Sequence, residues 1–457
     1  MITRSALRRV LIIAICAASL FSYAYVIDQL GRPGRITPVT LAMDFRAVYC
    51  SAQALAAHED PYRVLPSTTC QHAAADANAI VRIAGIVPTV LPPYAIVPIE
   101  PLAKLPFPLA SRLWFFALLA AFSSSVLLMT RMTGLPLLGV FASLFLSSFI
   151  ASFGEGQVGP VVTFFVVLTG WALWQRRYAM VAISSWALAF EPHIAGPVLL
   201  AIALFVGPAR RWLAAGGAVV ALLSIVANPA LTVEYLTAVL PLHNASEISY
   251  YGQYSLTSVL WIAGMSGRLA QVLGIGSYGL MIAIGLWLTK VALARTKELA
   301  YVAFIPAACA VVGGPYVHVF QICVAIPLVL LVAATPGTHR RIAMFSICLL
   351  AIPIQDMVRW SGHLSAIAFV PVRVTSRVLL ASRDANPIVD AYRSGGSDVR
   401  DFVPGPLAGR SLISRIPTWL GLLFALLALA QFLAKAAVTQ TDHHDRRDAI
   451  ASTIATA

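Results

Sequence analysis

Long apolar runs recur along almost the whole chain, and they decide what it can fold into. The first extends from Val10 to Val26, and most of the later ones approach the roughly 20 residues that a helix needs to cross a bilayer. Backbone amides find no partners in hydrocarbon, and continuous rather than alternating apolar runs favour helices over a barrel. The expected fold class is therefore all-α, a polytopic membrane protein with about twelve transmembrane helices.

Composition agrees, because only 11% of the 457 residues are charged. A soluble domain carries about 25%. We read Val10–Val26 as an uncleaved first span rather than a signal peptide, since many further spans follow. Those spans are expected at residues 113–130, 135–153, 158–174, 212–227, 278–293, 317–334, 342–357 and 419–438.

Three shorter apolar stretches, at 179–190, 194–206 and 301–313, are interpreted as short or broken helices. The sequence Glu191-Pro192-His193 separates the first two. Irregular backbone at membrane depth persists only beside protein or a water-filled cavity, so this interruption points to a site.

Lysine and arginine gather in one set of short connections, and the opposite short connections carry none. The basic set comprises Arg131, Arg176, Arg177, Arg210, Arg211, Lys290, Arg295, Lys297, Arg340 and Arg341. The positive-inside rule then makes this side and both termini cytoplasmic. This topology explains the net charge of +13 without nucleic acid as a partner.

We expect one transmembrane domain over 1–437, with external loops at about 27–111, 228–277 and 359–415. A cytoplasmic polar tail follows over 438–457. Cys50 and Cys70 share the first external loop and can form a disulfide if that loop lies outside the cytoplasm. The expected location is the plasma membrane of a bacterium, with these loops on the outer face.

Asp44 is the first candidate for chemistry. It opens a stretch with helical spacing that ends at Asp60-Pro61, which predicts a short helix along the membrane surface. Its carboxylate would suit a reaction with a substrate hydroxyl. An aspartate there also fits a helix N-cap, which is the preferred reading without further context, and Asp60 fits a turn former.

Other polar groups stand at predicted helix ends on the external side. Gln157 lies in a glycine-rich external turn, and His318 follows Gly313-Gly314-Pro315 at the membrane interface. Glu191 and His193 are functional candidates because ionisable groups are costly at membrane depth. No metal-ligand cluster, phosphate-binding glycine loop or nucleophile motif is visible.

Several short motifs, taken in order, resemble glycosyltransferase family 87, a branch of the GT-C membrane glycosyltransferases that includes mannosyltransferases. The residues that carry the resemblance are Asp44-Phe45 with Tyr49 and Ala52, Asp60-Pro61-Tyr62, Pro92-Pro93-Tyr94 with Pro101-Leu102, Gly156-Gln157, and Pro315 with His318 and Pro327. They cover the chain up to about residue 330.

The resemblance implies an enzyme that moves a sugar, with mannose the best guess, from a polyprenyl-phosphate carrier to a lipid or glycan acceptor with inversion. Asp44 would be the general base. The remaining assignments place His318, Arg46 and Arg359 at the donor phosphate, and Tyr62, Tyr94, Gln157 and His193 at the substrates. The arginines also suit lipid head groups.

No cofactor is expected, and the sequence leaves a metal requirement open. The alternative functions are a transporter or flippase of lipid-linked sugars, and a noncatalytic protein that binds polyprenyl lipids.

Overall fold

The structure is a computed structural model that describes residues 42–76, 89–145, 152–153, 156–249, 253–351 and 415–436, together with Val10, Ile13 and Ala17. These residues are helical apart from turns, and their only extended pairing is a bridge between Gln253 and His318. The predicted all-α class is confirmed.

Four described helices are long and apolar enough to cross a membrane. They are α7 (Phe107–Thr133), α13 (Arg210–Ala227) with η3 (Gly207–Ala209), α17 (Gly267–Thr296), and the helix Arg415–Ala436. The shorter apolar helices are α10 (Gly159–Trp174), α11 (Tyr178–Ala187) with η2 (Leu188–Phe190), α12 (Pro192–Phe205), α18 (Tyr301–Gly313), and η6 (Val319–Ala325) with α19 (Ile326–Ala334).

Two further helices, α8 (Leu137–Leu144) and α20 (Thr338–Ala351), coincide with parts of predicted spans. The predicted spans 10–26, 135–153 and 342–357 lie partly outside the described residues, so the count of about twelve stays a prediction. The external loop 359–415 lies outside them as well, except for Arg415.

Large apolar side chains cover the outside of the long helices. On α13, for example, Leu222, Ile225 and Val226 are each more than half exposed. Exposed apolar surface on this scale is unfavourable in water and favourable against lipid tails. The apolar helices and their exposed faces indicate a membrane protein.

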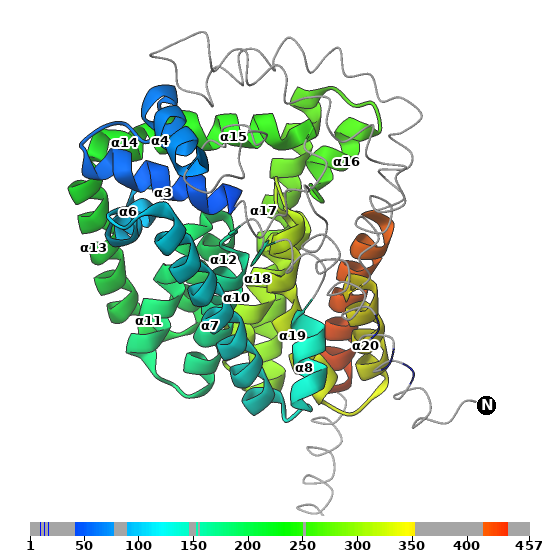
Figure 1. The fold of residues 1–457 in the computed structure, drawn as a ribbon. Helices are drawn as coiled ribbons and strands as arrows, with labels where there is room; N and C mark the ends of the chain where they lie inside the picture. Colours follow the sequence, from blue (N-terminus) through cyan, green and yellow to red (C-terminus); the bar gives the residue numbers. More distant parts are fainter. Residues whose placement is uncertain are drawn as a thin grey trace, which may run out of the picture.

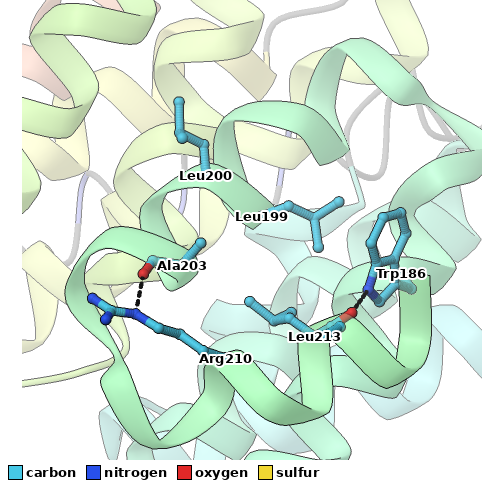
Figure 2. A pocket seen from close by; sticks show the side chains of 7 residues that line it. Trp186, Leu199, Leu200, Ala203, Arg210 and Leu213 are labelled. Carbon is cyan, nitrogen blue, oxygen red and sulfur yellow. Dashed lines mark hydrogen bonds between the residues drawn. The ribbon is translucent and has the colours of Figure 1, made fainter. Parts of the chain in front are cut away.

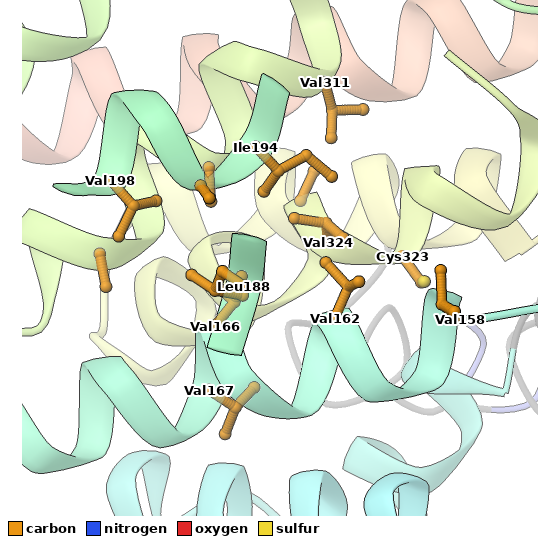
Figure 3. Packing of buried hydrophobic residues seen from close by; sticks show 14 of the residues in the cluster. Val158, Val162, Val166, Val167, Leu188, Ile194, Val198, Val311, Cys323 and Val324 are labelled. Carbon is orange, nitrogen blue, oxygen red and sulfur yellow. The ribbon is translucent and has the colours of Figure 1, made fainter. Parts of the chain in front are cut away.

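Helix α18 forms the centre of the bundle, where it packs against α10, α12 and α17. Every residue in it except Val312 is buried. Figure 3 shows the neighbouring core, in which valines of α10 meet Ile194 and Val198 of α12 and Val324 of η6. Side chains that are apolar around the whole helix explain why this short segment lies inside the bundle.

Consecutive helices run in alternate directions, so their connections fall at two opposite ends of the bundle. The turns at 156–158, 190–192 and 314–318 lie at one end. There α3 (Met43–Ala56), α14 (Pro229–Glu234), α15 (Leu240–Ser246) and α16 (Leu256–Ile262) also gather (Figure 1). The arginine pairs of the short connections fall at the other end, as the topology requires.

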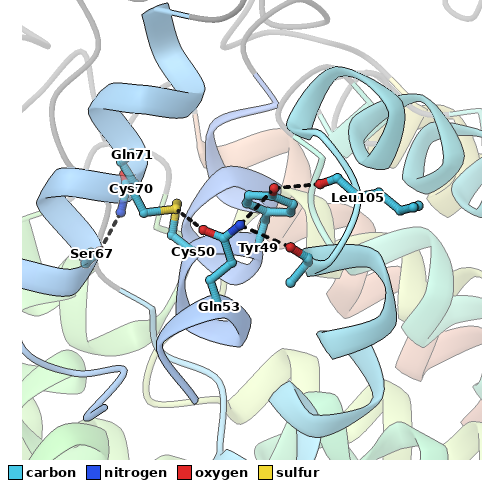
Figure 4. The surroundings of a disulfide bond; sticks show 8 residues. Tyr49, Cys50, Gln53, Ser67, Cys70, Gln71 and Leu105 are labelled. Atoms are coloured by element: carbon cyan, nitrogen blue, oxygen red, sulfur yellow. Dashed lines mark hydrogen bonds between the residues drawn. A yellow bond between two sulfur atoms is a disulfide. The ribbon is translucent and has the colours of Figure 1, made fainter. Parts of the chain in front are cut away.

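Helix α3 confirms that a short helix begins near Asp44, and its position along the membrane surface stays a prediction. It is joined to α4 (Val64–Asp76) by a disulfide between Cys50 and Cys70 (Figure 4). The Tyr49 hydroxyl donates to the carbonyl of Leu105 at 2.7 Å, which fixes the other side of α3. The proline-rich approach to α7 forms α5 (Pro93–Ile96), η1 (Val97–Ile99) and α6 (Glu100–Ala103), all in contact with α3.

The disulfide gives a first prediction. A cross-link over 20 residues stabilises a fold by about 3 kcal/mol, so Cys50→Ala/Cys70→Ala lowers the melting temperature clearly. The half-buried control Cys348→Ala changes it little. Mass spectrometry of the unreduced chain should recover tryptic peptides 47–63 and 64–82 as one linked species, and their recovery as separate peptides would contradict the pairing.

Candidate active site

The Asp44 carboxylate lies at the start of α3 and accepts a hydrogen bond from the Gln157 side-chain amide. Asp44 is partly exposed. The predicted N-cap role is wrong, because Ala42 is the N-cap residue and Asp44 lies within the first turn of α3. Its side chain is held instead by the turn before α10, 113 residues away in sequence.

Two glycines bring this turn close to its neighbours. Gly156 has φ +74°, and a Cβ there would lie 2.8 Å from the Cβ of Phe45. A Cβ on Gly159 would lie 3.1 Å from the carbonyl oxygen of Phe320. Trp114 donates to the Gly156 carbonyl at 2.8 Å and stacks on Phe45 at 5.1 Å. One turn therefore contacts both α3 and the start of η6.

His318 stands at the N-cap of η6, where a capping box holds it. Its backbone N–H donates to Gln321 Oε1 at 2.9 Å, and its ring stacks on Phe320 at 5.0 Å. Since Gly159 packs on Phe320, His318 and Asp44 lie on either side of the same turn.

A second polar pair lies where α11 ends and α12 begins. Pro192 at the first position of α12 starts the new helix and leaves Glu191 at its N-cap. Gln321 donates to Glu191 Oε2 at 3.0 Å, and His193 Nδ1 lies 3.4 Å from the same oxygen. Gln321 thus links Glu191, at the predicted break between two helices, to the backbone of His318.

His243 of α15, Glu247 and Gln253 complete the cluster. Glu247 Oε1 lies 3.7 Å from His243 Nδ1. Glu247 Oε2 lies 3.7 Å from His318 Nε2. Gln253 donates to Glu247 at 3.1 Å and accepts from the N–H of Val317 at 2.7 Å.

Burial decides the charge in this cluster. Desolvation raises the pKa of Glu247 to about 7, although the hydrogen bond from Gln253 acts in the opposite direction. Desolvation also lowers the pKa of His243 to about 4. The imidazole of His243 is therefore neutral near pH 7, and the ionised carboxylate needs a cation or further donors.

The other predicted site residues fall in three groups. Arg46 is 1% exposed. Desolvation lowers the pKa of its guanidinium, and the negative charge of the nearby Asp44 acts in the opposite direction. The hydroxyls of Tyr62 and Tyr94 donate to the carbonyls of Leu91 at 2.8 Å and Ala189 at 3.1 Å, so both have internal partners. Arg359 lies outside the described residues. These four assignments remain predictions. Asp60 confirms its turn role by accepting from the Tyr62 N–H at 2.8 Å.

The sequence interpretation missed His243, Glu247, Gln253 and Gln321. His243 and Glu247 are four residues apart, which puts them on one helix face, and that spacing was a usable signal. It also missed Arg415, which is 2% exposed and donates to the carbonyl of Gln253 at 2.6 Å.

A separate hollow of about 410 Å³ lies between α11, α12 and α13. Figure 2 shows it lined by apolar side chains, with Trp186 donating to the carbonyl of Leu213 and Arg210 to that of Ala203. None of the polar groups described above lines it. A hollow without converging polar groups does not suit a sugar or a phosphate.

The glycine turn gives a second prediction, with Gly134→Ala as a matched control. Both glycines have positive φ, but a Cβ on Gly134 would meet nothing within 4 Å. Gly134→Ala should cost about 1 kcal/mol of backbone strain. Gly156→Ala adds the overlap with Phe45 and should cost about 2–4 kcal/mol. Thermal unfolding in detergent compares them, and equal losses would contradict the close packing.

Comparison with known proteins finds one family. The sequence profile of glycosyltransferase family 87 matches residues 90–317, about half of the chain. The matched region contains Gln157, Glu191, His193 and Glu247, whereas Asp44 precedes it and His318 follows its last residue. No curated protein and no solved structure shows significant similarity to the chain. The chain belongs to glycosyltransferase family 87, and it is a glycosyltransferase of the membrane.

Proposed function

We propose that the protein transfers a sugar, with mannose as the first candidate, from a polyprenyl-phosphate carrier to a lipid or glycan acceptor on the external face of the membrane. The observation that carries the proposal is the partly exposed Asp44 carboxylate held by Gln157, next to the turn that also supports His318. The family assignment supports sugar transfer.

Asp44 acts as the general base. An acceptor hydroxyl becomes acidic only as it attacks the anomeric carbon, so an ionised carboxylate is basic enough to take its proton. The hydrogen bond from Gln157 holds this carboxylate beside the turn that precedes α10. Attack from the face opposite the carrier phosphate inverts the anomeric centre.

The carrier phosphate leaves from the opposite side of the sugar, where His318 stands. Charge builds on the leaving phosphate oxygen as the glycosidic bond breaks, and a hydrogen-bond donor fixed beside it stabilises that charge. The capping box and the stacked Phe320 ring hold the imidazole in one orientation. Arg46 and Arg359 are further candidates for this phosphate.

A lipid-linked donor suits the position of these groups. They lie at the end of the bundle opposite the short connections that contain most of the arginines. The positive-inside rule makes that end external. Nucleotide sugars are not expected on that face. The proposal accordingly locates the enzyme in a bacterial plasma membrane with both termini in the cytoplasm.

The test follows release of the free carrier phosphate from a panel of polyprenyl-phosphate sugars, using purified protein with and without acceptor. Asp44→Asn keeps the shape of the side chain and removes the base, so acceptor-dependent release should fall at least ~100-fold. The control Asp60→Asn keeps its turn and its rate.

Release that is unchanged in Asp44→Asn would contradict the role of Asp44. Release from no donor, together with movement of the intact lipid-linked sugar across vesicles, would favour the flippase alternative.

Gln157 gives a further prediction about positioning. Gln157→Leu keeps most of the volume and removes the hydrogen bond to Asp44, so kcat should fall about tenfold while KM changes little. Rate measurements over a range of acceptor concentrations separate the two constants. A rise in KM alone would assign Gln157 to substrate binding instead.

A further inference from the structure

Three side chains from two distant parts of the chain converge at the external end of the bundle. His243 comes from α15, Glu247 from η5 (Glu247–Ser249), and His318 from the turn before η6. Their ligand atoms all lie within 4.8 Å of one another. Two imidazoles and one carboxylate thus face a common point.

The spacing of these atoms is somewhat wider than that around a bound metal ion. Metal–ligand distances of about 2.0–2.2 Å put neighbouring ligand atoms of a tetrahedral ion about 3.4 Å apart. His243 Nδ1 and His318 Nε2 each lie 3.7 Å from a Glu247 oxygen. Shifts of a few tenths of an ångström would bring all three within bonding distance.

We propose that His243, Glu247 and His318 bind a divalent zinc-class ion and leave one coordination position open. Two histidines and a glutamate are a common ligand set of catalytic zinc, in which the fourth position takes water or substrate. Imidazole ligands favour zinc and its transition-metal neighbours over magnesium or calcium.

The surrounding residues orient the ligands as a metal site requires. Gln253 donates to Glu247 Oε2 at 3.1 Å and is held in place through Val317 and Arg415. The same amide nitrogen lies 3.3 Å from His318 Nε2. A bound ion would take the lone pair of His318 Nε2. Gln253 would keep its hydrogen bond to Glu247, and this bond orients the carboxylate.

Burial makes a cation favourable here. Neutral imidazoles and an ionised carboxylate are the forms that bind metal, and a recess packed with aromatic rings disfavours charged imidazoles. The ring centroids of Tyr316 and His243 are 5.2 Å apart, and those of Phe320 and His318 are 5.0 Å apart. A divalent ion then offsets the cost of the buried carboxylate.

The open position would take an oxygen of the carrier phosphate, a role that rests on the proposed function. Metal ligation by His318 replaces the direct hydrogen bond to the phosphate, and the ion stabilises the charge of the leaving group.

Zinc binding is measured on the full chain, purified without a polyhistidine tag, stripped with chelator and titrated against a chromophoric competitor. Because the tail contains His443-His444, the double variant His443→Ala/His444→Ala serves as background. We expect one tight site per chain in this background. Absence of a tight site would overturn the proposal.

Ligand variants are compared in the same background. Glu247→Gln and His243→Gln should weaken zinc binding by more than ~100-fold, because each removes a direct ligand. The control His339→Gln should not, since His339 is a buried histidine that contacts Thr335 at 2.8 Å outside the cluster. Unchanged affinity in Glu247→Gln would overturn the site.

X-ray absorption on the zinc-loaded chain answers the same question without a variant. The expected spectrum shows two imidazoles with oxygen ligands and no sulfur. A sulfur shell, or a shell without imidazole, would overturn the assignment.

Asp44→Asn separates this inference from the proposed function, because that variant should lose transfer and keep zinc. A chain that transfers sugar but binds no zinc at these residues overturns the metal site and leaves the proposed function standing. A chain that binds zinc through these residues but releases no carrier supports the metal site and overturns the proposed function.

Discussion

The close approach of the Gly156–Gly159 turn to α3 on one side and η6 on the other is the contact on which the site depends. A Cβ at Gly156 would overlap Phe45, and one at Gly159 would press on the Phe320 carbonyl. Side chains at these positions would push apart the elements that carry Asp44 and His318. This four-residue turn thus fixes the relative positions of the candidate base and the candidate phosphate site.

Polar groups collect where helices end, for a physical reason. In the membrane interior an ionisable group is costly, whereas helix ends already expose backbone N–H and C=O groups that need partners. Glu191 lies at the N-cap position of α12 and accepts a hydrogen bond from Gln321, which in turn accepts one from the backbone N–H of His318. These bonds join the ends of separate helices into one network, so the site is held by the bundle rather than by a flexible loop.

Sequence patterns predicted the short buried helices well, because apolar runs end at clear breaks. The run 301–313 coincides with α18, and the break at Glu191 coincides with the start of α12. The same patterns underestimated the length of α17. This helix begins at Gly267 rather than near residue 278, and its first turns contain glycine, serine and arginine, which interrupt the apolar run.

The site was only partly predictable. Asp44 was chosen for its place at a helix start, but local context could not distinguish a cap from a partner of Gln157 far along the chain. The pair His243 and Glu247 was readable from its spacing. Their meeting with His318 depends on how α15 and η6 pack, which no local pattern contains.

The central claim is that Asp44 and His318 act on one bound donor. A cryo-electron microscopy structure with a non-hydrolysable phosphonate analogue of a polyprenyl-phosphate sugar tests it directly. We expect the phosphonate beside His318, with the anomeric carbon turned toward Asp44 and room for one hydroxyl between them. A phosphonate bound at the basic end of the bundle, or an anomeric carbon turned away from Asp44, would contradict it.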